Sequence, residues 1–461
     1  MRLKRVLTLR TIVATSAGLT LASATFVAAV QVAGFLAGDS AWLAILIAGV
    51  LCLGAGMCFS ELNDILPSAA GIRLYFGRAF GDRFALTISM LYMFVIMGVV
   101  GAESFILAKV LNYAVPAVDA LVWIVIMLVS VTLMNIRGIK IAGTFQDIIT
   151  YGLMAAMLVL AFIGLEKIDY HLDAPFLTGD LGGLFNAVAV GVFLFVGFEW
   201  VTPLAEEVRE SRLISKGMFI AIGILSIIYS FFTVIMAAVV PNEELIGSPI
   251  PQLLFARSVM GDTGVVLIVI ISLAASITTF NAGLLSVSRF FYAAAREHAL
   301  PAVFTRISRY LTPWVAIVAV FMVGLTLSVI ILFTGRYLLL VNMAAAAECI
   351  VYSLAGVSVI VLRKKMADRE RNFKMPMGPA IPVITTVVFA FLAVGVITTD
   401  PIMAVWMVAG LVILWWYVNK VVPIIKEKNR AGRAVRRRPR PSGDAGVVPA
   451  ASPTSDSREK V

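Results

Sequence analysis

Long apolar runs, each of them long enough to cross a lipid bilayer, dominate this chain of 461 residues. Hydrophobic residues make up 61% of the sequence and charged residues only 14%, and the mean hydropathy is +0.98. A water-soluble protein of this length could not bury so much apolar surface. The composition therefore predicts a polytopic membrane protein built from helices.

Apolar runs of roughly 18–25 residues predict twelve membrane-spanning helices. The expected ranges are 11–36, 41–60, 84–111, 120–136, 143–165, 183–205, 216–240, 262–293, 312–334, 338–362, 380–398 and 401–419. The first run follows Arg2, Lys4 and Arg5, as the apolar part of a signal peptide would. It is too long for that role and predicts a membrane helix instead.

Positive charge is distributed unevenly between the two sides of the predicted bundle. If the N-terminus is cytoplasmic, all but four of the 37 lysines and arginines fall on the cytoplasmic side. This asymmetry predicts a multi-pass protein of the cell membrane with both termini in the cytoplasm. Residues 1–420 are expected to form the membrane domain, and residues 421–461 a basic, disordered cytoplasmic tail. For this tail, contact with anionic lipids of the bilayer is favoured over nucleic-acid binding.

Three glutamates, Glu103, Glu199 and Glu348, lie inside apolar runs that carry no lysine or arginine at comparable depth. A carboxylate is costly in hydrocarbon, so such residues usually face a protein-lined cavity and bind a proton, an ion or a cationic ligand. Sites for anionic substrates would instead be expected to contain buried arginine or lysine. The alternative interpretation is a carboxyl group that is protonated or hydrogen bonded to freed backbone.

Two predicted spans contain interruptions near their middle. The first has small and hydroxylic residues from Gly18 to Thr25, and the sixth has Gly191 and Gly197 close to Glu199. Paired interruptions of this kind indicate a transporter binding site, because the freed backbone groups face a cavity and can bind a substrate carboxylate. The alternative is a seam of small residues for close helix packing.

Four segments carry a family resemblance. They are Ser60-Glu61-Leu62 with Pro67, Gly71, Tyr75 and Ala79-Phe80-Gly81; Gly197-Phe198-Glu199 with Ala205-Glu206-Glu207-Val208; Ser288-Arg289 through Arg296 with Leu300-Pro301 and Thr312-Pro313; and Arg371-Asn372-Phe373 with Pro376, Gly378-Pro379 and Pro382. In this order, over about residues 11–420, they resemble the amino acid/polyamine/organocation (APC) permease superfamily.

The resemblance implies an all-α membrane protein with twelve transmembrane helices, arranged as two inverted five-helix repeats plus two extra helices. It also implies alternating access around a site near the membrane midplane. The substrate-binding residues implied in this way, together with the residues around the sixth-span interruption, are Thr20, Ser23, Ala24, Thr25, Val100, Phe193, Val196, Phe198, Glu199 and Glu348. Glu199 and Glu103 are the expected proton-coupling residues, with Phe198 as a gate.

A charge network is expected at the cytoplasmic ends of the helices. Its members are Glu61, Glu206, Glu207, Arg209, Arg212, Arg289 and Arg296. Such a network would close the cytoplasmic side in an outward-open state, and isolated interfacial charges are the alternative.

The sequence thus predicts a secondary active transporter of an amino acid or related amine, working by proton-coupled symport or exchange. Protons are favoured over sodium as the coupling ion, because the three unpaired carboxyls can bind protons, whereas the hydroxyls of Thr278 and Thr279, which could bind sodium, more often bond a carbonyl of their own helix. The fifth span departs from the family here, since Leu153 stands where some proton-coupled members have a lysine that takes the place of a sodium ion. No enzymatic activity, cofactor, metal site or nucleic-acid partner is expected. A polyamine or diamine exchanger is one alternative. A non-transporting sensor is another, since Ala22 and Ala24 replace the family's usual glycines.

Overall fold

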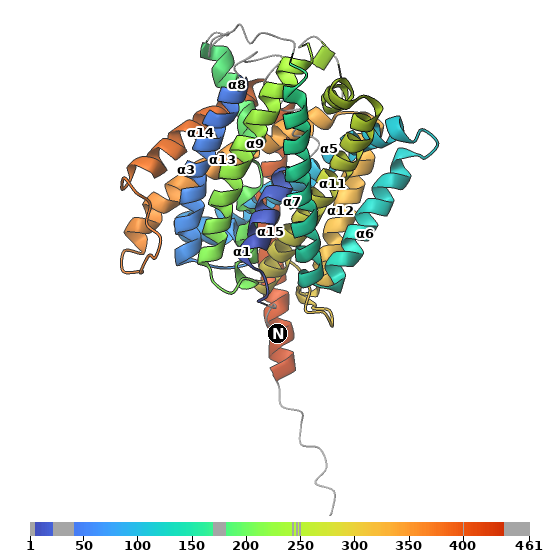
Figure 1. Ribbon diagram of the computed structural model, residues 1–461. Coiled ribbons are helices and arrows are strands. Elements are labelled where there is room, and N and C mark those ends of the chain that lie inside the picture. The colour runs from blue at the N-terminus through green and yellow to red at the C-terminus, as the bar shows by residue number, and fades with distance from the viewer. Residues whose placement is uncertain are drawn as a thin grey trace, which may run out of the picture.

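Helices form the regular structure of the protein in the computed structural model, and most of them run along a common direction (Figure 1). The structure describes residues 5–21, 41–168, 181–241, 244, 245, 248, 250–399 and 401–437. These residues contain no strand, and an isolated bridge joins Leu7 to Val208. The expectation of an all-α protein is confirmed.

Ten helices within the described ranges are long and apolar enough to cross a membrane. They are α3 (Ala41–Ile65), α5 (Asp82–Ala114), α6 (Ala120–Arg137), α7 (Ile139–Leu165), α9 (Arg212–Val239), α11 (Pro251–Arg296), α12 (Trp314–Thr334), α13 (Tyr337–Lys365), α14 (Ala380–Thr399) and α15 (Pro401–Arg437). Each overlaps one expected span. The last of them, α15, continues past residue 420, where the sequence places the end of the membrane domain.

Each of the remaining two expected spans begins with a shorter helix. Helix α1 (Leu9–Thr20) ends within the predicted first span, and the rest of that span lies outside the described residues. Helix α8 (Leu181–Phe193) is followed by turns and then by the 3₁₀ helix η3 (Phe198–Glu206). The predicted interruption of the sixth span is therefore confirmed.

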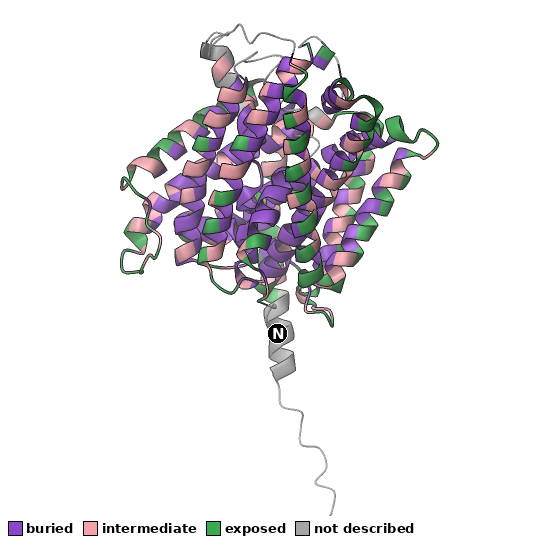
Figure 2. Cartoon of the chain, in the orientation of Figure 1, coloured by how far each residue is buried: buried purple, intermediate pink, exposed green. Residues whose placement is uncertain are grey.

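Helix α1 lies at the centre of the bundle, and all residues from Thr11 to Thr20 are buried (Figure 2). It packs against α7, α9, α11 and η3. Small residues allow this close approach: a Cβ atom on Gly18 would lie 1.9 Å from Nε2 of Gln146. The same Nε2 donates a hydrogen bond to the Ala14 carbonyl, 3.3 Å away. Small residues and interhelical hydrogen bonds are the usual means of helix association in membranes.

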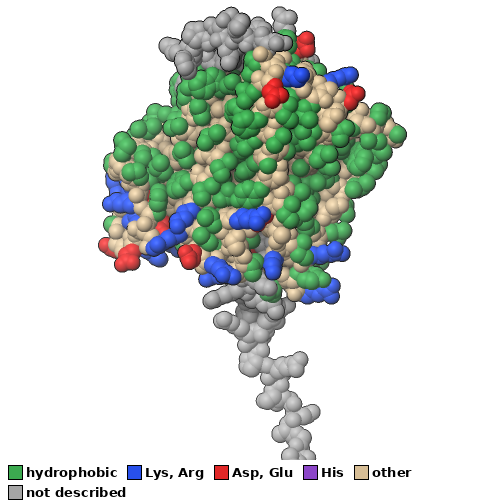
Figure 3. All heavy atoms as spheres, viewed as in Figure 1, with side chains coloured by type: hydrophobic (Ala, Val, Ile, Leu, Met, Phe, Trp, Pro, Cys, Tyr) green, Lys and Arg blue, Asp and Glu red, His purple; other side chains and the backbone are tan. Residues whose placement is uncertain are grey.

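The outer faces of the bundle are apolar. Large hydrophobic side chains are exposed on α6, α12, α14 and α15, for example those of Ile126, Phe333, Phe391 and Trp416. Figure 3 shows such residues as a broad band, with lysines and arginines gathered toward the lower end of the molecule. This end also holds the described N-terminal residues (Figure 1) and is called the basic end below. A lipid-facing surface of a multi-pass membrane protein has this character.

Ion pairs join the helices at the basic end. Arg289 of α11 pairs with Glu207, which follows η3, at 3.1 Å, and both side chains are fully buried. The N–H groups of residues 6 and 7 donate to the carbonyl of Glu207, which holds the chain start against the same segment.

Two further pairs connect other elements at this end. They are Arg363 with Glu61 at 2.7 Å and Arg296 with Glu206 at 2.6 Å. Of the predicted network, the three glutamates, Arg289 and Arg296 are thus paired. Arg209 and Arg212 form no ion pair among the described residues, and Arg363 takes a place that the sequence analysis had not assigned.

The buried Arg289–Glu207 pair leads to a stability prediction. Replacing Arg289 with methionine would leave an unpaired carboxylate in a dry environment, which costs about 3–5 kcal/mol. Replacing Arg296 with methionine breaks a partly exposed pair, for which a cost of about 0–1 kcal/mol is expected. Thermal unfolding of the two purified variants in one detergent measures the difference. Equal unfolding temperatures would contradict the assigned importance of the buried pair.

Candidate functional site

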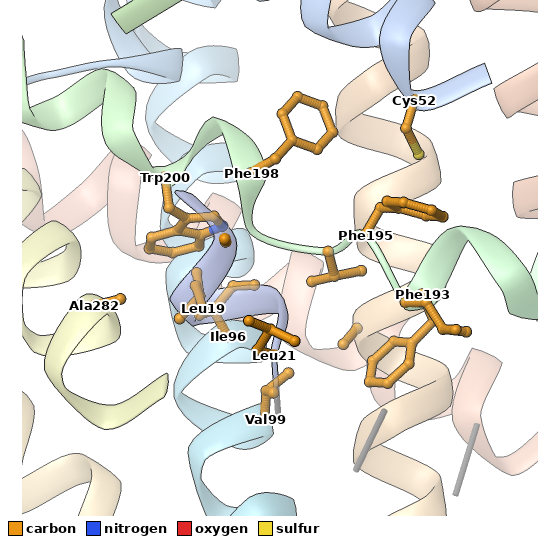
Figure 4. Packing of buried hydrophobic residues seen from close by; sticks show 14 of the residues in the cluster. Leu19, Leu21, Cys52, Ile96, Val99, Phe193, Phe195, Phe198, Trp200 and Ala282 are labelled. Atoms are coloured by element: carbon orange, nitrogen blue, oxygen red, sulfur yellow. The ribbon is translucent and has the colours of Figure 1, made fainter. Parts of the chain in front are cut away.

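The site is built around the break between α8 and η3. Gly197 lies at this break with φ of 108°, a left-handed conformation that strongly favours glycine. The α1 residue Leu19 approaches so closely that a Cβ on Gly197 would lie 2.5 Å from its Cδ2. The hydrophobic close-up shows Trp200 above Leu19 and Phe198 projecting to the other side of the segment (Figure 4).

Carbonyl groups freed by the break are bound by serine side chains from neighbouring helices. Ser16 of α1 donates to the carbonyl of Phe198 at 2.8 Å, and Ser286 of α11 donates to that of Trp200 at 2.5 Å. In a membrane interior such carbonyls need internal partners, because no water competes for them. These two bonds fix η3 between α1 and α11.

Five buried side chains form a hydrogen-bonded cluster directly after the break. The Tyr92 hydroxyl of α5 is hydrogen bonded to Oε1 of Glu199 and lies 2.7 Å from Oε1 of Glu348 on α13. Trp200 Nε1 donates to the same hydroxyl at 2.8 Å, and the Tyr352 hydroxyl donates to Oε2 of Glu199 at 2.9 Å. All five side chains are at most 2% exposed. This set is called the Tyr92 cluster below.

The hydrogen bonds of the Tyr92 cluster limit its protonation. A tyrosine hydroxyl has one proton to donate and can accept two hydrogen bonds. One acceptor position is used by Trp200, so Tyr92 can donate to only one of the two carboxyl oxygens that face it. The other carboxyl must then donate to Tyr92 and must itself carry a proton. In this arrangement the two glutamates share at least one proton.

The surroundings favour a particular place for that proton. Glu199 is within reach of two hydroxyl donors, whereas Oε2 of Glu348 is buried without a hydrogen-bond partner. The charged form is stabilised by donors, so when the pair holds one proton, this proton belongs on Glu348 and the negative charge on Glu199. Neither carboxyl forms an ion pair within the described part of the chain.

Aromatic rings enclose the Tyr92 cluster. The ring of Phe198 lies 5.3 Å from that of Tyr352 and 6.2 Å from that of Phe59, centroid to centroid. A cavity of about 10 Å³, room for roughly one water molecule, adjoins the cluster and is lined by Tyr92, Glu199 and Thr202 among others. The carboxyl pair therefore lies in an almost dry environment.

Glu103, the third buried acid, lies apart from this cluster. It accepts a hydrogen bond from Ser276 of α11 at 2.5 Å. Both Tyr92 and Glu103 are on α5, and eleven residues of helix separate them by about 16 Å along the axis. The structure thus brings Glu199 and Glu348 together and leaves Glu103 at a second position.

The other expected site residues lie around the end of α1 or outside the described residues. The carbonyl of Thr20 accepts a hydrogen bond from Tyr229, and Val100 of α5 lines a small apolar cavity of about 20 Å³. Phe193 is the last residue of α8 and Val196 lies within the turns that follow it, and both are buried. Ser23, Ala24 and Thr25 fall outside the described residues.

Tyr92 and Tyr352 are cluster members that the sequence analysis missed. Tyrosines are common in apolar runs, and their partner Glu199 is far away along the chain, 107 residues from Tyr92 and 153 residues from Tyr352. The signal available was the need of a buried tyrosine or tryptophan for a polar partner. No group of three or more histidine, cysteine, aspartate or glutamate side chains that could bind a metal ion is found among the described residues.

Comparison with known proteins places the chain in a class of transport proteins. The family model described as amino acid permease matches residues 7–422. The chain belongs to the amino acid permease family. This assignment confirms the resemblance seen in the sequence, and it makes the protein a permease-type transporter and not an enzyme.

Curated relatives of the permease cover most of its length. The methylthioribose transporter of Bacillus subtilis (strain 168) is 25% identical over 87% of this chain and 91% of its own length. The branched-chain amino acid permease BcaP of the same organism is 26% identical over 83% and 87%, respectively. The human large neutral amino acids transporter small subunit 2 is 25% identical over 77% of this chain and 69% of its own length.

Substitution of Gly197 tests the geometry of the break. Alanine at this position would meet both the left-handed φ and the side chain of Leu19, so we expect Gly197→Ala to destabilise the permease by about 1–3 kcal/mol. Gly152→Ala on α7 is the matched control, since a Cβ there meets nothing within 4 Å. Thermal unfolding should separate the two variants. A Gly197→Ala protein as stable as the control would contradict the described conformation.

Proposed function

We propose that this permease is a secondary active transporter that moves an amino acid or a related amine across the cell membrane by proton-coupled alternating access. The observation that carries the proposal is the Tyr92 cluster, in which two buried glutamates share a proton at the break of a membrane span. Such a pair can change its charge only by binding or releasing a proton or by binding a cationic group.

The proposed topology includes the two interrupted spans. Together with the ten long helices, α1 with its continuation and α8 with η3 make twelve spans, in the two inverted repeats that the family resemblance implies. Both termini are then cytoplasmic, the basic end faces the cytoplasm, and the basic residues after 420 form a cytoplasmic extension. The ion pairs at the basic end close the cytoplasmic side of the protein, as expected for an outward-open state.

The proposed mechanism uses the protonation of the Tyr92 cluster as a switch. Glu199 is on η3, Tyr92 on α5 and Glu348 on α13, so the shared proton ties the broken span to two other helices. If the pair loses this proton, two carboxylates face one hydroxyl and repel each other in a medium of low dielectric constant. Release of the proton therefore loosens η3, and rebinding restores the bonds. A substrate ammonium group that approached the pair would compensate the same charge.

The relatives support the substrate class. Two of them are named for branched-chain and for large neutral amino acids. The methylthioribose transporter shows that a relative of similar identity is assigned a substrate without an amino acid backbone. A carboxyl pair without a matching lysine or arginine favours an amine-bearing substrate over an anionic one. Glu103, near Ser276, is a candidate second proton site.

A counterflow panel in proteoliposomes tests the proposal. Proteoliposomes that contain the purified protein and are loaded with an unlabelled amino acid or amine should exchange it for the labelled compound outside. A pH gradient of one unit should drive about tenfold accumulation of the labelled compound at 1:1 coupling with protons. Accumulation that requires sodium and ignores the pH gradient would refute proton coupling. Exchange confined to diamines would favour a polyamine or diamine exchanger. Binding without any counterflow would identify a sensor.

Neutral substitutions of the acids test the switch separately. We expect Glu199→Gln and Glu348→Gln to retain exchange but to lose the accumulation driven by the pH gradient, because the pair can no longer bind and release its proton. Glu103→Gln, about 16 Å away along α5, tests the candidate second proton site in the same assay. Retained pH-driven accumulation in both cluster variants would show that the coupling proton binds elsewhere.

A further inference from the structure

A polar pocket of about 290 Å³ lies at the basic end, away from the Tyr92 cluster. Its wall combines the first turns of α9, the end of α3 and the segment after α13. The polar side chains in the wall are those of Asp64, Ser211, Arg212, Ser215, Lys216 and Asn372. Neither the ion pairs of the basic end nor the proposed transport cycle uses this pocket.

The two cations of the pocket lack anionic partners. Arg212 donates one hydrogen bond, to Oδ1 of Asn372 at 3.2 Å, and forms no ion pair. Lys216 makes neither an ion pair nor a hydrogen bond with any described residue. The carboxylate of Asp64 is already bound by the backbone N–H groups of Asn372 and Phe373, at 2.6 and 3.1 Å. The pocket therefore holds two cations and one carboxylate, a formal net charge of +1, and neither cation forms an ion pair with a described residue.

The start of α9 adds positive potential. The N-terminus of a helix carries partial positive charge, so cations in its first turns are unfavourable unless an anion is bound. Here the N–H groups of Leu213 and Ile214 already donate to the carbonyls of Glu210 and Ser211, so a bound anion would rely on side chains. Ser211 occupies the N-cap position without a side-chain capping bond. Ser215 is only 9% exposed and lines the pocket, so its hydroxyl is placed to donate to a ligand there.

A stripe of α9 connects the pocket to the lipid-facing surface. Lys216, Ile220, Gly223 and Ile227 follow one another at helical spacing, and the isoleucines are exposed, Ile227 by 66%. A Cβ on Gly223 would meet no atom within 4 Å, so this position leaves an open notch in the stripe. An apolar chain can lie along this stripe while its charged end reaches the cations of the pocket.

We propose that this pocket binds the phosphoryl headgroup of an anionic membrane phospholipid, with an acyl chain along the exposed stripe of α9. Arg212 and Lys216 supply the charge, and the serine hydroxyls donate hydrogen bonds to phosphoryl oxygens. Arginine and lysine are the usual ligands of phosphate groups, and helix N-termini provide ready-made anion sites. A basic pocket between helices at the membrane surface is typical of lipid headgroup recognition.

Lipid titration of the delipidated, full-length protein tests the proposal. Native mass spectrometry counts bound phosphatidylglycerol or phosphatidylcholine on the wild type and on the Arg212→Gln/Lys216→Gln variant. Loss of two surface cations predicts about 30-fold weaker phosphatidylglycerol binding and unchanged phosphatidylcholine binding. The Arg306→Gln/Arg309→Gln variant is the matched control, because it removes two exposed arginines at the same end. Equal phosphatidylglycerol binding by both double variants would overturn the proposal.

Two further variants and a soluble probe identify the source of the phosphoryl group. The Arg212→Lys/Lys216→Arg variant keeps both charges and should retain lipid binding, which separates a charge effect from misfolding. Gly223→Leu fills the notch and should weaken binding of the lipid. If inorganic phosphate at millimolar concentration displaces no phosphatidylglycerol, and Gly223→Leu weakens lipid binding, the lipid assignment stands. The opposite result is that inorganic phosphate binds tightly and that Gly223→Leu changes the binding of neither phosphate nor lipid. This result would reject the acyl-chain contact and assign the pocket to a soluble phosphate.

Discussion

The single hydroxyl of Tyr92 solves the main physical problem of this fold, which is the presence of two carboxyl groups side by side in a dry membrane interior. An ionised carboxylate in such a medium needs donors, and two adjacent carboxylates repel each other strongly. By donating to one glutamate and accepting from the other, Tyr92 lets the pair exist with a single negative charge. Trp200 fills the last acceptor position, so the arrangement leaves no unsatisfied group at this oxygen.

The same bonds determine how the broken span is held. Gly197 releases the backbone from helical geometry, and the freed carbonyls are then bound by Ser16 and Ser286. On the other side, Glu199 connects η3 to α5 and α13 through the cluster. The bonds to α1 and α11 involve neutral groups and do not depend on protonation. The bonds through Glu199 do, so the broken span has one permanent and one proton-dependent attachment.

Hydropathy and helix-breaking residues predicted most of the fold, because span length and glycine conformation are local properties of the chain. Thus the break at Gly197 and the start of the expected span at residue 262, just after the non-helical Gly261, agree with the structure. Contacts between segments that are distant along the chain leave no local sequence pattern, so they were not predicted. The sequence analysis grouped Glu103 with Glu199, although helix rise places Glu103 far from Tyr92, and it gave no partner role to Arg363. It also had no means to single out Tyr92 among the aromatic residues of the apolar runs.

The length of η3 links the proposed proton switch to the closed basic end. At about 2 Å per residue of 3₁₀ helix, the distance along this element from Glu199 to its last residue, Glu206, is roughly 14 Å. Burial raises the pKa of Glu206, but hydrogen bonds from Arg296 and from the N–H of Ala69 outweigh this and hold the pKa below its ordinary value. Glu206 therefore stays ionised at neutral pH and keeps its ion pair.

The two ends of η3 thus differ in how they respond to a proton. The end at Glu206 keeps its charge, and the next residue, Glu207, is held by the buried Arg289. The end at Glu199 belongs to a pair whose hydrogen bonds require a proton. A change of protonation at Glu199 therefore acts on the attachment of η3 to α5 and α13, while the bonds from Ser16 and Ser286 and the ion pairs at the basic end remain. In the proposed transport cycle, opening of the cytoplasmic side therefore needs a second event that breaks the ion pairs. Because the loss of a proton does not break them, it does not open both sides of the protein at once.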